Sequence, residues 1–62
     1  MNDNMRMRFI KTLNGLDESG RLHLLRLETC NELAVLFELA FLGGYTGVAA
    51  SIEVAANSTG DY

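Results

Sequence analysis

The chain has no proline and only one cysteine among its 62 residues. Because proline interrupts helices, its absence favours uninterrupted helical segments. The single cysteine, Cys30, can form no disulfide within the chain, and no cluster of cysteine and histidine residues offers a zinc site. Chains this short bury too little surface to be very stable alone. Because neither a disulfide nor a zinc site is available to stabilise a single copy, we expect oligomerisation.

Basic residues are absent from the second half of the chain. All five lie within the first 26 positions, whereas every charged residue beyond them is acidic and the net charge is −3. Nucleic-acid-binding proteins usually present a strongly basic face, and the composition of this chain is too weakly basic to indicate one. Nucleic-acid binding through a basic amino-terminal helix is therefore a second alternative, in which phosphates or an acidic partner would contact Arg6, Arg8 and Lys11.

The amino terminus also lacks the unbroken apolar run of a secretory signal. A lone thiol suits a reducing compartment. Both features lead us to expect a cytoplasmic protein.

Apolar residues recur at helical spacing near the amino terminus and predict a helix over residues 3–14. The stripe consists of Met5, Phe9, Leu13 and Leu16. A turn is expected at residues 15–17, because Gly15 can take the left-handed conformation that ends a helix. Asp17 can then cap the next helix with its side-chain oxygen.

A long second helix is expected over residues 18–56, followed by a polar tail at 57–62. Polar residues on both sides of Gly43 and Gly44 keep the same helical phase, which favours a helix that continues through the two glycines with a mild kink. A break at 43–44 is the alternative. The fold class is therefore all-α, as a single small domain in which a short helix and a long helix form a hairpin.

The segment from Leu33 to Ile52 is apolar apart from Glu38. A first helix of about 18 Å cannot cover Phe41 and Val48 on a second helix of nearly 60 Å. We therefore expect copies of the chain to associate into an intermolecular helical bundle, a homodimer or tetramer. The expected interface combines small residues, which allow close helix approach, with large flanking side chains: Leu33, Leu36, Phe37, Ala40, Phe41, Gly43, Gly44, Gly47, Val48, Ser51 and Ile52.

A single membrane span is the first alternative. Gly43 and Gly47 match the GxxxG pattern of dimerising transmembrane helices, and basic residues lie only on the amino-terminal side. In this case the protein would lie in the inner membrane with its amino terminus in the cytoplasm. Against this, Glu38 would be costly at depth in a bilayer.

Catalytic constellations are missing from the sequence. Glu28 and Glu32 lie one helical turn apart, but the Glu-x-x-His spacing of helical metal sites does not occur. In one helix, His23 and Cys30 would lie about 10 Å apart, too far for one to activate the other. We therefore expect no cofactor and no enzymatic activity. The expected function is protein–protein interaction by a small homo-oligomeric regulator or adaptor, which compactness alone suggests to be of bacterial or phage type.

Overall fold

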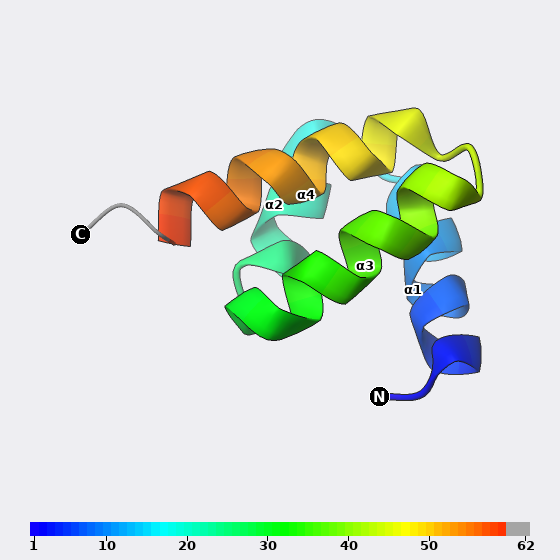
Figure 1. Cartoon of the computed structure of the whole chain (residues 1–62). Coiled ribbons are helices and arrows are strands. Elements are labelled where there is room, and N and C mark those ends of the chain that lie inside the picture. The colour runs from blue at the N-terminus through cyan, green and yellow to red at the C-terminus, as the bar shows by residue number, and fades with distance from the viewer. Residues whose placement is uncertain (60–62) are drawn as a thin grey trace.

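The computed structural model describes residues 1–59, which form four helices and no strand (Figure 1). The helices are α1 (Asp3–Asn14), α2 (Glu18–Leu25), α3 (Cys30–Leu42) and α4 (Thr46–Thr59). The prediction of an all-α protein is confirmed. The predicted hairpin is not what the chain forms, since residues 18–59 contain three helices in place of one long helix.

Side chains at the amino ends of the first three helices accept hydrogen bonds from backbone N–H groups. Asn2 Oδ1 accepts from Met5 N at 2.8 Å, and Asp17 Oδ1 accepts from Gly20 N at 2.8 Å. Each cap satisfies a donor that the first turn of a helix leaves without a partner. At the other end of α1, the left-handed conformation expected of Gly15 is wrong: its φ is −83°, and its N–H bonds to carbonyls of the last turn.

The first break in the expected long helix lies at residues 26–29. Thr29 Oγ1 accepts a hydrogen bond from Glu32 N at 3.1 Å and begins α3. The sequence contains a signal for this start, because threonine followed three residues later by glutamate is the spacing of a capping box. Helical phase alone does not reveal this start, because the residues before and after Thr29 keep the phase of one continuous helix.

The second break lies at Gly43 and Gly44, where α3 ends and the chain reverses. Gly44 has φ +84°, Gly44 N donates to Phe41 O at 3.2 Å, and Tyr45 N donates to Ala40 O at 2.9 Å. This pair of bonds with a left-handed glycine is the Schellman motif that ends many helices. The break at 43–44 is thus the correct alternative, and the GxxxG pair is divided, with Gly43 ending α3 and Gly47 inside α4.

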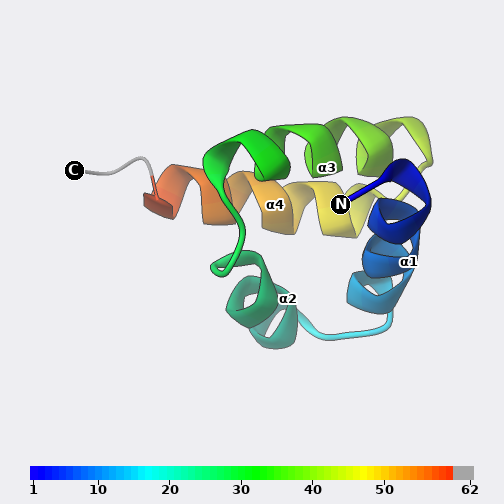
Figure 2. The same cartoon turned by 90° about the horizontal axis from the view of Figure 1, so that it is seen from below.

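The reversal lays α4 antiparallel beside α3, as both views show (Figures 1 and 2). α2 packs on α4, and α1 contacts both α3 and α4. The longest dimension of the molecule is 31 Å, about half of what one continuous helix would need. Every helix contributes to one core, made of Ile10, Leu13, Leu25, Leu33, Leu36, Ala40, Val48, Ala49, Ile52 and Ala55.

This core corrects the expectation that a partner must cover the apolar segment. Val48 is fully buried and Ile52 is 1% exposed, because α4 folds back onto α3 and the chain covers these side chains itself. Phe41 is different, since 63% of its surface remains exposed. Within the segment from Leu33 to Ile52, the large apolar side chains that remain exposed therefore all lie on α3.

Candidate functional site

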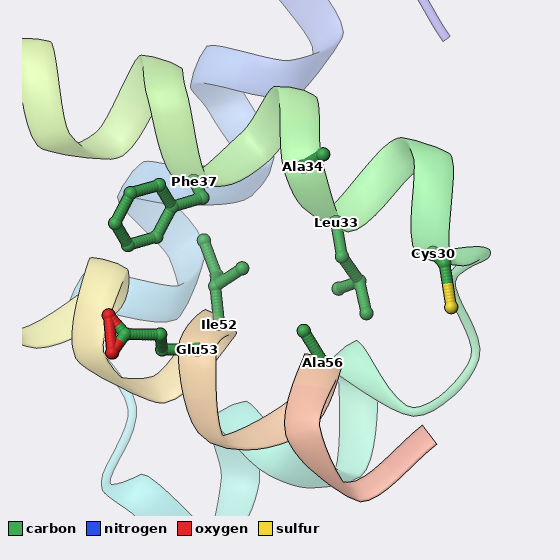
Figure 3. Close-up of a pocket in the computed structure, with 7 residues that line it drawn as sticks. All are labelled: Cys30, Leu33, Ala34, Phe37, Ile52, Glu53 and Ala56. Atoms are coloured by element: carbon green, nitrogen blue, oxygen red, sulfur yellow. The ribbon is translucent and has the colours of Figure 1, made fainter. Parts of the chain in front are cut away.

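A groove of about 360 Å³ runs between α3 and α4 (Figure 3). Leu33 and Ile52 form its floor, since both are almost completely buried. Figure 3 shows Leu33 pointing from α3 toward α4, and Ile52 and Ala56 pointing from α4 toward α3. The lining residues are Cys30, Leu33, Ala34 and Phe37 from α3, and Ile52, Glu53 and Ala56 from α4. A concave, mainly apolar surface of this kind is a typical binding site.

Two stacked phenylalanines extend the apolar surface beyond the groove. Phe37 lines the groove, and its ring lies 6.0 Å from that of Phe41, with an angle of 7° between the two planes. The contact forms because residues four apart lie on the same side of a helix. It holds the exposed Phe41 ring against the wall of the groove.

Further apolar side chains lie on the outer face of α3. Leu42 is 74% exposed and Val35 is 37% exposed. Single exposed apolar residues are ordinary on protein surfaces, whereas a cluster on one helix is typical of an interaction site. We call the surface formed by Ala34, Phe37, Phe41 and Leu42 together with the groove the docking face.

The charge beside the docking face is negative. Glu53 lines the groove from α4, and Glu38 is exposed on α3 three residues before Phe41. No lysine, arginine or histidine occurs in residues 27–59. These two glutamates therefore have no basic neighbour on their own helices.

The eleven residues expected at an oligomer interface divide into two groups in the structure. One group is buried inside the chain with at most 1% of the surface exposed: Leu33, Leu36, Ala40, Val48, Ser51 and Ile52. Ser51 Oγ donates to Gly47 O, one turn earlier in the same helix, at 3.1 Å. The second group reaches the surface in part or fully: Phe37, Phe41, Gly43, Gly44 and Gly47.

The basic residues expected to contact phosphates also have different roles. Arg6 donates to Glu32 on α3, with Nε 2.6 Å from Oε2, and to Asp3, with Nη1 2.9 Å from Oδ1. The hydrogen bond with Glu32 raises the pKa of Arg6 above its usual range. Arg8 and Lys11 lie exposed on α1. Arg6 thus holds two helices together, and only the other two residues present their charge outward.

The groups considered for metal or acid–base chemistry are dispersed. Within residues 1–59, no three histidine, cysteine or acidic residues lie where they could hold one metal ion. His23 lies on α2 and Cys30 begins α3, so the two no longer share one helix.

Membrane insertion was the first alternative function. None of the helices formed by residues 1–59 has both the length and the apolar character needed to cross a bilayer.

Comparison with protein-family models, with curated proteins and with solved structures finds no match.

Four of the residues that line the groove were not predicted from the sequence: Cys30, Ala34, Glu53 and Ala56. Their proximity depends on the reversal at Gly44, which brings α4 alongside α3. The glycine pair was the available signal, because glycine is strongly preferred just after a helix.

Proposed function

We propose that this protein is non-enzymatic and acts by binding another protein through the docking face. The observation that carries the proposal is the 63% exposed Phe41 ring stacked on Phe37, which lines the apolar groove; Leu42, 74% exposed, follows Phe41 on the same helix. Aromatic anchors next to a pocket are typical of the residues that dominate binding energy. A protein that binds a partner without catalysing a reaction acts as an adaptor or a regulator.

The free energy gained by burying the two exposed side chains, Phe41 and Leu42, is not enough for stable binding. Burying a large apolar side chain fully contributes roughly 1.5 to 3 kcal/mol, whereas association costs at least about 4 kcal/mol before any net affinity appears. Phe41 and Leu42 together only offset that cost. The groove walls must therefore also be covered, so the partner spans the whole docking face.

The area gives a similar result. A stable interface buries about 800 Å² on each partner. The described chain exposes 4072 Å², so such an interface would cover about a fifth of its surface. The groove and the exposed apolar side chains of α3 would form the apolar part of such a contact, and the polar surface around them, including Glu38 and Glu53, would supply the rest.

Phe41→Gln tests the proposal, with Leu27→Gln as the matched control. Leu27 is 76% exposed but follows α2 and does not line the groove, so both changes remove one exposed apolar side chain. Sedimentation gives the mass of each variant, and affinity capture from the source cells identifies retained proteins. We expect wild type and the Leu27 variant to retain the same partner and the Phe41 variant to lose it, with unchanged helical circular dichroism.

Two results would overturn the proposal. One is a wild-type protein that sediments as a single copy and retains no protein. The other is a Phe41 variant that retains the partner as well as wild type does. Self-association has its own signature, a wild-type mass above that of one chain that falls to one chain in Phe41→Gln.

A further inference from the structure

We propose that the docking face receives one amphipathic helix of a partner protein whose apolar stripe is flanked by lysine or arginine. This inference rests on the proposed function and names the chemistry of the partner. It is carried by the spacing of the apolar residues on α3, by the position of the two glutamates, and by the absence of basic residues from α3 and α4.

The spacing on α3 fits a helical occupant. Cys30, Ala34, Phe37 and Phe41 follow one another at intervals of four, three and four residues. Intervals that alternate between three and four produce the straight seam along which two helices pack. The floor of the groove is closed by Leu33 and Ile52, so an occupant lies along the surface and does not enter the core. A partner helix laid in such a groove contacts it with residues at i, i+3 or i+4, and i+7.

The glutamates lie on the two sides of this seam. Glu38 is on α3 and Glu53 is on α4. Figure 3 shows the Glu53 carboxylate at the same end of the groove as the Phe37 ring. The other acidic residue of α3, Glu32, is already paired with Arg6 and does not contribute a free charge. Basic side chains along both edges of an incoming helix would therefore meet carboxylates, and acidic ones would be repelled.

A second copy of this chain does not supply that chemistry. In a two-fold symmetric contact each copy presents the same face, so Glu38 and Glu53 of both copies would lie at the interface with no basic residue of α3 or α4 to pair with them. The basic helix α1 of another copy is also unsuitable, because two of its large apolar side chains, Ile10 and Leu13, are fully buried in its own core. The charge pattern thus favours a different protein over self-association.

A pair of designed peptides tests the inference. Each is a labelled helical peptide of about fourteen residues, long enough to follow α3, with leucines at the spacing of the α3 seam. One carries lysine along both edges and the other carries glutamate at the same positions. Fluorescence anisotropy measures the affinity of each peptide for wild type, for Glu38→Gln/Glu53→Gln, for Phe41→Gln and for Glu18→Gln. Glu18 is an exposed glutamate on α2 and serves as the control for charge removal away from the docking face.

The expected result is selective binding of the lysine peptide, at least about tenfold tighter than the glutamate peptide and weakened by salt. The double glutamine variant should bind the lysine peptide about fivefold more weakly, since exposed charge pairs contribute modestly. Phe41→Gln should reduce the affinity of both peptides, and Glu18→Gln should leave both unchanged.

Three results would overturn the inference. Equal affinity for the two peptides would show a docking face without charge selection. An unchanged affinity in the double variant would remove the glutamates from recognition. Failure to bind either peptide, by a wild-type protein that still captures a partner dependent on Phe41, would rule out a helical occupant and leave the proposed function standing.

Discussion

Arg6 and Glu32 join the first helix to the third through two parallel hydrogen bonds. Arg6 Nε lies 2.6 Å from Glu32 Oε2, and Nη2 lies 3.1 Å from Oε1. Both side chains are largely sheltered, with 19% and 16% of their surfaces exposed. Paired, planar contacts of this kind fix orientation as well as distance. The contact holds α1 against α3 although the two residues are far apart in the sequence.

This ion pair predicts a loss of stability in acid. The hydrogen bond from Arg6 lowers the pKa of Glu32 below its usual value of 4.5. A carboxyl group whose pKa is lower in the folded than in the unfolded chain stabilises the fold above the unfolded pKa, and this contribution is lost as the pH falls through the folded pKa. The free energy of unfolding, measured by urea titration, should therefore fall below about pH 4.5. Both Arg6→Gln and Glu32→Gln should show a shallower fall, and a slope equal to that of wild type in both variants would contradict the assignment.

Gly44→Ala tests the reversal between α3 and α4. Gly44 has φ +84° and no atom lies within 4 Å of an added Cβ, so the cost comes from backbone conformation alone. We expect a loss of about 1 to 2 kcal/mol in the free energy of unfolding. Gly15→Ala is the matched control, because Gly15 has a negative φ and its added Cβ would meet only Thr12 O at an ordinary 3.5 Å. That variant should be neutral or slightly more stable, and equal losses in both would be inconsistent with a left-handed Gly44.

Ile52→Ala should come close to unfolding the protein. Ile52 is 1% exposed, and removing such a side chain from a core costs roughly 2 to 5 kcal/mol. A domain of this size has only about 3 to 9 kcal/mol in total. The control is Val54→Ala on the same helix, where 44% exposure predicts a loss below about 0.5 kcal/mol. Thermal denaturation followed by circular dichroism measures both, and similar midpoints for the two variants would disagree with the burial of α4.

Thr29→Ala should weaken the start of α3. Its hydroxyl satisfies Glu32 N, and losing such a cap costs about 1 kcal/mol. Thr29→Ser keeps the acceptor oxygen and should stay near wild type in the same urea titration. If alanine were instead stabilising, the chain would prefer one continuous helix through residues 26–29.

The docking face was partly predictable, and the part that was not depended on non-local contacts. Phe41 was expected to need cover from outside, and it does remain exposed. Val48 was expected to need the same cover, yet it is fully buried. Both residues lie in one apolar segment, and its hydrophobicity does not show which of them folds inward.

The amino-acid sequence by itself determined that the chain is helical, because apolar residues recur at helical spacing and proline is absent. It also determined where the apolar segment and the acidic half lie. Only the tertiary structure decided that α4 turns back at Gly44 and covers α3. Helical phase is a local property that continues across residues 43–44 in either case, whereas the reversal is stabilised by Val48 and Ile52 packing against Leu33 and Leu36. That burial is a free-energy term between distant residues, and it decides which apolar side chains become core and which form the docking face.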